Sequence, residues 1–557
     1  MTVRPTRTRR PRVVLLTAGV IALSLAAAGC SGKAGGSTSS SPSGGAAPYT
    51  LSADTPAPKG EIDSFTWADY AAPESMDYAY AYDYPINTIL SNVCESLLRW
   101  NPDLTITPNL AEKFSNPTPT TWVYDLRSDV TFHDGTTMTA DDVVASLKRH
   151  LDPNVGSYWA SVFKNVKSID KTGPLQVTVT LTQPDSMFNQ YMAVSPGTVD
   201  SAATFKADGA DYGNSTKLVN CTGPFSIESW KSGESMVLAR YDNYWNAPAK
   251  AKAKKVNFVF LQDPNTRINA LTSGQVDGSW DAPSNAYAQL QSPGAPGKLY
   301  FGINTVVDDF IISNLSGALK DVRMRQALLM ALDREGMVKT AEKGYAKVTN
   351  SLVTRNNWLG VPSDQLDKIY GDLPQYPYDP VKAKALAKEA GANGQKVVIA
   401  TSPLGDNVTI ATTALAAAVK AIGLEPVITT ITPDKYTELF SSADARKGID
   451  LYHTTWYTSL ADPEEMYSTL RCNEFANYGN WCDPAFDAAD KKTIASPFGS
   501  QERLDSMILQ QKIGATELPW LPLYEIPQSV WLGKKITGVH PSVYYLYTPW
   551  ANEIGAA

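Results

Sequence analysis

One segment decides the class of fold, residues 396–431, which read KVVIATSPLGDNVTIATTALAAAVKAIGLEPVITTI. Residues 396–401 and 426–431 are short apolar runs rich in β-branched residues, which is typical of strands. Between them, Val408 to Ile422 has the pattern of a helix that Gly423 ends. A strand, a helix and a second strand in this order predict a β-α-β unit, so at least one part of the chain is α/β.

The chain on the N-terminal side of this unit alternates between strand and helix signals. Residues 122–126 and 175–181 alternate apolar and polar side chains, which predicts half-buried strands. The segment 139–142, Thr-Ala-Asp-Asp, has the residue types of a helix start, and residues 380–391 run from a helix-opening Pro to a Gly that ends the helix. The body of the protein is therefore a mixed α/β fold.

The first 48 residues have a different composition. Five arginines and no acidic residue precede an apolar run from Val13 to Ala28. This run is shorter than the about 20 residues that a membrane span needs and is typical of a signal peptide. It ends in Ala27-Ala28-Gly29-Cys30, which resembles the lipobox of bacterial lipoproteins. An ordinary cleaved signal and a single-pass anchor are the alternatives, and Arg9-Arg10 leaves the export route, general secretory or twin-arginine, open.

We therefore predict a signal peptide over residues 1–29 and lipid attachment at Cys30. Residues 31–48 are almost all Gly, Ser, Ala, Pro and Thr, a composition that cannot bury enough apolar surface to fold. Residues 30–60 are expected to be a flexible, lipid-anchored tether. The protein should then lie at the outer face of the cell membrane, attached through the lipid and with no nucleic acid as partner.

Charge and composition narrow the class of function. The whole chain of 557 residues, enough for three or four domains, has a formal charge of −7. Removing the five signal-peptide arginines leaves 44 basic residues against 56 acidic ones, a charge of −12, which argues against nucleic-acid binding. The four histidines are far apart, and no H-E-x-x-H, G-x-S-x-G or phosphate-loop motif occurs. These absences weakly favour a binding protein over an enzyme. The alternative is a secreted hydrolase that uses the acidic residues Asp462, Glu464 and Glu465.

The four cysteines after Cys30 are expected to form disulfides, because a secreted chain folds in an oxidising compartment. Cys472 and Cys482 are close in sequence, which leaves Cys94 to pair with Cys221 over a long range. Metal binding is the alternative, but no C-x-x-C spacing supports it.

Several blocks of sequence, in the same order, resemble the family 5 extracellular solute-binding proteins of ABC importers, the oligopeptide, dipeptide and nickel-binding type. The family patterns F-x-D-G-x-x-x-T-A-x-D-V, G-T-G-P-Y, T-R with G-E-V-D, D-V-R-V-R-Q-A-L and Y-D-P-E-K-A are matched, with departures, at residues 132–143, 221–225, 266–277, 321–334 and 378–383. Any one block is weak evidence, but their shared order makes the resemblance specific.

This resemblance implies a class II (type II) periplasmic-binding-protein fold with two hinged lobes and an extra third domain. Residues 61–90, 217–304 and 523–557 would form lobe I, residues 91–216 the extra domain, and residues 305–522 lobe II. It implies a monomeric binder without catalysis, cofactor or metal that closes on a small solute and delivers it to permease and ATPase subunits. A peptide-like cargo is expected, and an oligosaccharide, an opine or a nickel chelate is the alternative.

The same resemblance indicates a cleft wall at Trp456. The stretch Trp456-Tyr457-Thr458-Ser459 corresponds to the family's G-W-x-x-D segment, whose tryptophan lines the pocket. In peptide binders, the Asp of that segment holds the α-ammonium of the ligand, whereas this chain has Ser459, which brings no countercharge. Either another acid such as Asp462 takes this role, or the ligand is not an ordinary peptide. His453 keeps a metal-chelate ligand open.

A second candidate surface is rich in tyrosine. Tyr70 and Tyr78 belong to an early segment that, in the family, lies beside the ligand. If residues 78–84 were extended, the tyrosines at every second position would share one face, although an aromatic layer packed between domains explains them as well. Asn477 and Tyr478 form a third, weaker candidate.

Overall fold

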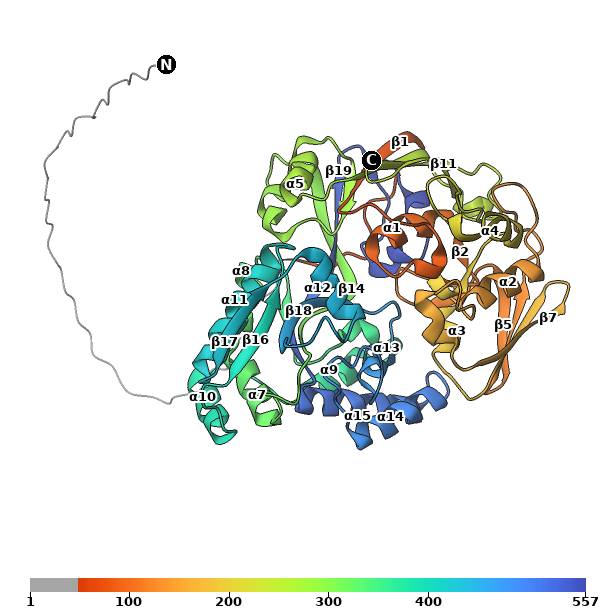
Figure 1. Cartoon of the computed structure of the whole chain (residues 1–557). Coiled ribbons are helices and arrows are strands. Elements are labelled where there is room, and N and C mark those ends of the chain that lie inside the picture. Colours follow the sequence, from red (N-terminus) through yellow and green to blue (C-terminus); the bar gives the residue numbers. More distant parts are fainter. Residues whose placement is uncertain (1–48) are drawn as a thin grey trace, which may run out of the picture. The chain divides into compact units, whose positions relative to one another are not determined.

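The computed structural model describes residues 49–557 (Figure 1). The predicted signal peptide and the lipid-attachment residue Cys30 lie outside the described residues. No helix between residues 49 and 557 is both long and apolar enough to cross a bilayer.

Two long strands, β14 (Gly297–Ile312) and β19 (Trp520–Gly533), pair antiparallel in the middle of the central sheet (Figure 1). On one side of this pair, β19 also pairs with β13, in the half of the sheet that we call lobe I. On the other side, β14 also pairs with β18, in the half that we call lobe II. The lobe I strands are β10 (Phe225–Lys231), β11 (Ser235–Arg240), β12 (Ala253–Phe260), β1 (Ile62–Asp69) and β13 (Gly278–Trp280). The lobe II strands are β18 (Leu451–Tyr457), β16 (Lys396–Thr401), β17 (Glu425–Thr430) and β15 (Lys347–Val348), the last paired with β19.

The β14–β19 ladder is interrupted between Gly302 and Val306, where the chain passes from one lobe to the other. A Cβ at Gly302 would lie 1.3 Å from the carbonyl oxygen of Pro541, so this approach of two backbones requires glycine. The predicted lobe boundaries at 304/305 and 522/523 fall inside these two strands. We keep that division as a proposal for the bodies that move.

The β-α-β unit predicted in lobe II is confirmed. Strands β16 and β17 pair in parallel from Lys396 opposite Glu425 to Thr401 opposite Thr430, and α11 (Asp406–Ala421) connects them. Leu415 and Val419 of α11 are buried in the lobe II core. Helices α7 (Val322–Ala331) and α10 (Pro380–Glu389) pack on each other beside α11, and α10 begins at the predicted proline.

The extra domain contains a four-stranded antiparallel sheet in the order β5-β6-β8-β7. Its strands are β5 (Ala111–Thr118), β6 (Thr121–Leu126), β7 (Val166–Gly173) and β8 (Gln176–Leu181). Helix α2 (Ala140–Arg149) packs on this sheet, and the Asp142 carboxylate accepts a hydrogen bond from the Thr139 N–H at 2.9 Å. The predicted strands at 122–126 and 175–181 and the predicted helix start are therefore confirmed.

The remaining strands are short and form three pairs. The strand pairs are β2 (Glu95–Ser96) with β9 (Thr198–Val199), β3 (Leu98–Trp100) with β4 (Ile106–Pro108), and β20 (Ile536–Thr537) with β21 (Gly555–Ala556). The helices are α1 (Tyr84–Val93), α3 (Phe188–Tyr191), α4 (Ala202–Asp208), α5 (Pro264–Ser273), α6 (Tyr287–Leu290), α8 (Arg334–Thr340), α9 (Ser363–Gly371), α12 (Pro433–Ser441), α13 (Pro463–Tyr467), α14 (Pro484–Ala495) and α15 (Gln501–Glu517).

The predicted tether extends too far, because residues 51–60 pack on lobe I. The Ser52 N–H donates to the Phe301 carbonyl at 2.6 Å, and the Lys59 N–H donates to the Ala556 carbonyl at 2.8 Å. Thr55 is 7% exposed, and its hydroxyl donates to the Val539 carbonyl at 3.0 Å. Composition did not reveal this segment, because its backbone hydrogen bonds hold it rather than an apolar run.

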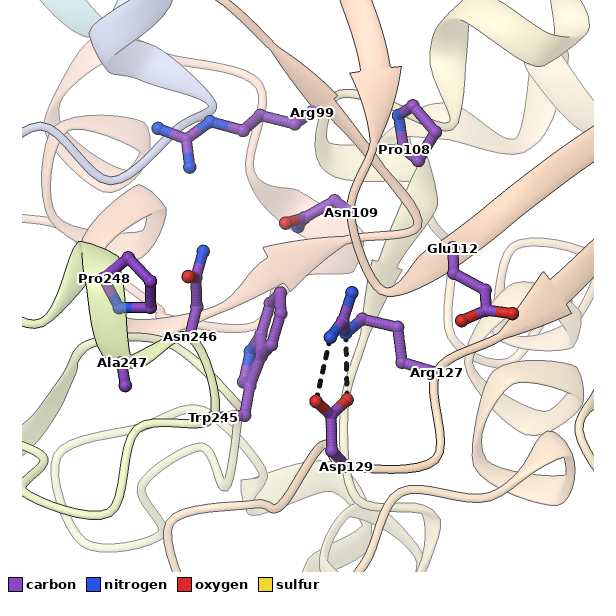
Figure 2. Close-up of a pocket in the computed structure, with 10 residues that line it drawn as sticks. All are labelled: Arg99, Pro108, Asn109, Glu112, Arg127, Asp129, Trp245, Asn246, Ala247 and Pro248. Carbon is purple, nitrogen blue, oxygen red and sulfur yellow. Dashed lines mark hydrogen bonds and ion pairs between the residues drawn. The ribbon is translucent and has the colours of Figure 1, made fainter.

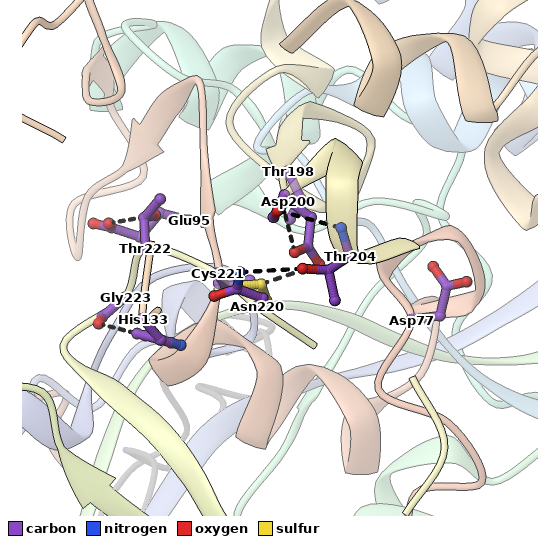
Figure 3. Close-up of a disulfide and its surroundings, with 12 residues drawn as sticks. Asp77, Glu95, His133, Thr198, Asp200, Thr204, Asn220, Cys221, Thr222 and Gly223 are labelled. Atoms are coloured by element: carbon purple, nitrogen blue, oxygen red, sulfur yellow. Dashed lines mark hydrogen bonds between the residues drawn. A yellow bond between two sulfur atoms is a disulfide. The ribbon is translucent and has the colours of Figure 1, made fainter. Parts of the chain in front are cut away.

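Both expected disulfides are present, Cys94–Cys221 and Cys472–Cys482. Figure 3 shows the surroundings of Cys221, with Asp200 nearby. Within residues 49–557, the one Cys/His/Asp/Glu cluster close enough to hold a metal is Cys94, Asp200 and Cys221. Because its two cysteines are bonded to each other, this cluster offers no thiolate to a metal.

His540 joins the start of the described chain to its end, and this contact makes a prediction about pH. Its Nδ1 lies 2.5 Å from Asp54 Oδ1, and its Nε2 lies 2.8 Å from Glu553 Oε2. The hydrogen bond to Glu553 is the main cause that raises the pKa of His540 from 6.5 to about 8. A raised pKa stabilises the fold fully below pH 6.5, and this contribution is lost as the pH rises through 8.

We predict that His540→Gln lowers stability at pH 6 by on the order of 1 kcal/mol and has less effect at pH 9. Urea unfolding of the wild type and the variant at the two pH values measures this difference. An equal loss at both pH values would contradict the proposed charge interaction.

Candidate functional site

Trp456 and Tyr457 end β18 at the place where β14 changes lobe. Their ladder partners on β14 are Val307 and Val306, next to the interruption described above. The half-buried Trp456 ring packs edge-on against Trp520 at 5.1 Å, so lobe II supports one side of it. These two residues thus stand at the edge of lobe II that adjoins lobe I.

Tyr457 reaches from lobe II to lobe I. Its hydroxyl donates a hydrogen bond to the Tyr82 carbonyl, and its ring packs edge-on against Tyr84 at 4.9 Å. Tyr82 in turn stacks on Tyr158 of the extra domain at 4.3 Å. Aromatic rings from all three parts of the fold therefore meet at one place, an arrangement suited to the flat and apolar faces of a ligand.

The expectation that residues 78–84 form one extended face is wrong. Tyr78–Tyr80 is a turn of 3₁₀ helix and Tyr84 begins α1, because the carboxylates of Asp77 and Asp83 accept backbone N–H bonds that start these helices. Tyr78 is fully buried, with its hydroxyl donating to the Ser146 carbonyl at 2.9 Å, so it belongs to the core. Tyr70, in contrast, is 38% exposed.

Ser459 lies beside an acid that the sequence analysis did not place in the cleft. Its N–H donates to Glu465 Oε1 at 3.0 Å, and the Leu460 N–H donates to Glu465 Oε2 at 2.6 Å. The Ser459 hydroxyl accepts a hydrogen bond from Tyr547 at 2.8 Å. Glu465 is the third residue of α13, which Asp462 caps, so the pattern Asp-Pro-x-Glu was a signal for a side chain that reaches back over the preceding loop.

Asp462 is committed to internal bonds. It is 2% exposed, and its Oδ2 lies 2.9 Å from Arg503 Nη2 and accepts a hydrogen bond from Gln190 Nε2 at 3.1 Å. Its Oδ1 accepts the Glu464 N–H at 3.0 Å at the start of α13. The alternative that Asp462 replaces the family's ammonium-binding Asp therefore receives no support from its contacts.

The acidic cluster considered for hydrolysis points in three directions. Asp462 binds Arg503, Glu465 binds the backbone of residues 459 and 460, and Glu464 is 1% exposed. Burial, followed by the charge of Asp490, raises the pKa of Glu464 well above its usual value. The three carboxyl groups do not form an acid–base pair open to a substrate.

Asn477 and Tyr478 support the site from behind. Asn477 is 4% exposed, and its amide bonds to the Arg471 carbonyl at 2.9 Å and to the Trp481 N–H at 2.9 Å, which shapes the loop closed by Cys472–Cys482. Tyr478 is buried and stacks on Trp520, the ring that supports Trp456, at 6.1 Å. His453 is also buried, and its Nε2 lies 3.0 Å from Asp308 Oδ2, so it is not available to a chelate.

A separate surface pocket of about 490 Å³ lies at the junction of lobe I and the extra domain (Figure 2). Arg127 pairs there with Asp129 at 2.8 Å and lies 4.6 Å from the Trp245 ring centre. None of the predicted site residues lines this pocket.

Residues 105–477 match the model of the bacterial extracellular solute-binding proteins, family 5 Middle. Because the match covers more than half of the chain, the protein belongs to this family of solute-binding proteins, which are not enzymes. The type II binding-protein fold expected from the sequence agrees with the two lobes and the extra domain described above.

Individual relatives are similar over most of their length. The glutathione-binding protein GsiB of Escherichia coli K12 is 23% identical over 81% of this chain and 86% of its own. The periplasmic oligopeptide-binding protein OppA of the same strain is 25% identical over 80% and 84%. The structure of the periplasmic binding protein DppA from Helicobacter pylori, in complex with the peptide STSA, shares the fold with a TM-score of 0.77, at 20% identity over 89% of this chain and 99% of DppA.

The buried Asp462–Arg503 pair yields a prediction about stability. Asp462→Asn should destabilise the protein by about 3–5 kcal/mol, because it leaves the Arg503 charge buried without its partner. The control Asp444→Asn, at a surface position where the side chain is 84% exposed, should change the free energy of unfolding by less than about 0.5 kcal/mol. Denaturant unfolding measures the free energy of unfolding of both variants. A wild-type value for Asp462→Asn would show that Asp462 is not a structural residue.

Proposed function

We propose that this protein is the substrate-binding lipoprotein of an ABC importer and that it captures an oligopeptide or peptide-like solute. The observation that carries this proposal is the meeting of Trp456 and Tyr457 of lobe II with Tyr82 and Tyr84 of lobe I beside the lobe crossing. A solute between these rings contacts both lobes only when the lobes are closed. Its binding energy therefore favours the closed form.

The nature of the cargo is supported by the relatives and by the chemistry of the site. GsiB and OppA are named for glutathione and oligopeptides, and both ligand classes are peptide-like. Aromatic walls with a few fixed polar groups suit a chain of amides and side chains. An oligosaccharide, an opine or a nickel chelate is the alternative cargo, and the burial of His453 argues against its serving as a chelate ligand.

Membrane attachment completes the proposal. Cys30 follows a signal-peptide pattern and precedes a Gly/Ser-rich segment, so the lipid and the tether would hold the monomer at the outer face of the membrane. The closed, loaded protein would then dock on permease subunits, with the ATPase subunits on the other side of the membrane.

Protein lacking residues 1–30 should be stabilised by its cargo without consuming it. A thermal-shift screen over di- to pentapeptides, oligosaccharides, opines and nickel chelates finds the class, and a solute at 100 times its dissociation constant should add about 2.7 kcal/mol. Mass spectrometry of the stabilising solute should find it unchanged, and product formation would overturn the binding function.

Trp456→Ala should weaken binding of that solute at least tenfold, about 1.4 kcal/mol, because an aromatic wall of the cleft is lost. Trp230→Ala is the matched control, since Trp230 is a half-buried tryptophan on β10, in the edge strand of lobe I. Isothermal titration calorimetry of the two variants tests the site. Equal weakening by both would remove Trp456 from the binding site.

A further inference from the structure

Two carboxylates lie at one edge of the lobe I sheet. Strands β1 and β13 are parallel neighbours, with Trp67 opposite Gly278 and Ala68 opposite Ser279. Asp69 is the last residue of β1, and Asp281 directly follows β13. The carboxyl ends of adjacent parallel strands lie at one edge of a sheet, which is where open α/β sheets bind ligands.

Asp281 is held by two side-chain hydrogen bonds and is half-buried. Its Oδ1 accepts a hydrogen bond from Gln528 of β19 at 2.8 Å, and its Oδ2 accepts one from the Tyr545 hydroxyl at 2.8 Å. Tyr545 stacks on Trp280 at 4.1 Å, which fixes the phenol. The backbone of Asp281 has φ of +49°, a conformation that a residue other than glycine adopts at a cost.

Asp69 has a buried oxygen with nothing bound to it. The side chain is 6% exposed; its Oδ1 accepts the Tyr70 N–H at 2.7 Å, and its Oδ2 has no hydrogen-bond partner in residues 49–557. A buried acceptor without a partner costs about 1–3 kcal/mol, so this oxygen is where a donor from outside the chain would be stabilised most.

A third carboxylate, Asp83, belongs to the same region. Asp83 directly precedes Tyr84, the ring that Tyr457 contacts, and its Oδ1 accepts the Tyr84 N–H at 2.7 Å. Burial, followed by the negative charges of Asp281 and Asp83, raises the pKa of Tyr84 well above its usual value. We call Asp69, Asp83 and Asp281 the lobe I acidic set.

The chain balances the charge of this set only in part, through Arg267 at longer range. No Lys, Arg or His in residues 49–557 lies within 4.0 Å of any of the three carboxylates. Arg267 is the one cation that lowers the pKa values of Asp69 and Asp281 at longer range, and its Nη1 donates to the Leu261 carbonyl. Burial still raises the pKa of Asp69 to about 7 and that of Asp281 to about 6.

We infer that the cleft takes a solute with a positively charged ammonium or guanidinium group and that the lobe I acidic set holds this group. The inference rests on the proposed solute-binding function and names the chemical class of the cargo. An ammonium brings three N–H donors, which match the unpaired Asp69 Oδ2 and the remaining acceptor capacity of Asp281. The Tyr84 ring adds cation–π attraction, whereas the Tyr70 ring already has the Arg267 guanidinium 6.0 Å from its centre. The negative charge that Ser459 lacks in lobe II is thus supplied from lobe I.

Titration calorimetry on protein lacking residues 1–30 tests this inference with four probes. The peptides are Ala-Lys-Ala, Ala-norleucine-Ala and their N-acetylated forms, so that the side-chain and terminal ammonium groups are removed separately and together. The peptide without either ammonium should bind at least tenfold more weakly than the best charged peptide. Equal affinities for the peptides with and without an ammonium group would overturn the inference.

Two variants locate the charge. Asp281→Asn and Asp83→Asn should each lower the affinity for the best ammonium-bearing peptide at least fivefold, and neither should lower the affinity for the peptide without an ammonium. Asp83→Asn keeps a residue that caps α1 well, so this variant preserves the helix start while it removes the charge. Asp63→Asn, on the same strand as Asp69 but with a side chain 88% exposed, is the matched control and should change no affinity.

The outcomes separate the inference from the proposed function. Suppose that peptides with and without an ammonium group bind equally and that Trp456→Ala lowers the affinity for both. Peptide binding then stands, and the role of the lobe I acidic set is refuted. If the two Asn variants bind the charged peptides like the wild type, that role is refuted as well. If none of the four peptides binds, the peptide-like cargo and the inference both fail, while a solute of another class from the wider screen would keep the binding function.

Discussion

The backbone ladder between β14 and β19 is the constraint on which the rest of the structure depends. Both strands belong to both lobes, so the lobes share one sheet and cannot separate without breaking it. The ladder is weakest between Gly302 and Val306, where pairing is interrupted and the Pro541 backbone approaches Gly302 closely. The closure that we propose would bend the sheet at this interruption, next to Trp456 and Tyr457.

The site combines a stiff support with charge that the chain balances only in part. Trp520, Tyr478 and the Asp462–Arg503 pair fix the lobe II wall, so the exposed edge of Trp456 keeps its position without a ligand. On the lobe I side, Asp69 Oδ2 has no hydrogen-bond partner in residues 49–557, which costs folding energy. Asp462 is thus a structural acid, whereas the lobe I acidic set is the one that we propose for the solute.

Local patterns predicted the regular elements well, and long-range contacts account for what they missed. The β-α-β unit at 396–431 and the capped helix after Thr139 follow from neighbouring residues alone. The packing of residues 51–60 on lobe I, the burial of Tyr78 and the ion pair of Asp462 with Arg503 depend on partners far away in sequence. Trp456 was proposed through a family pattern and Glu465 has a local signal in Asp-Pro-x-Glu, whereas the proximity of Asp69 and Asp281 depends on the pairing of β1 with β13.

The central claim is that a solute closes the two lobes on each other at Trp456 and Tyr457. Small-angle X-ray scattering of protein lacking residues 1–30, with and without a saturating solute found in the screen, tests it most directly. The account predicts a smaller radius of gyration with the solute, and no such change in Trp456→Ala at the same solute concentration. A radius of gyration that is unchanged when calorimetry shows the wild type saturated would contradict the account.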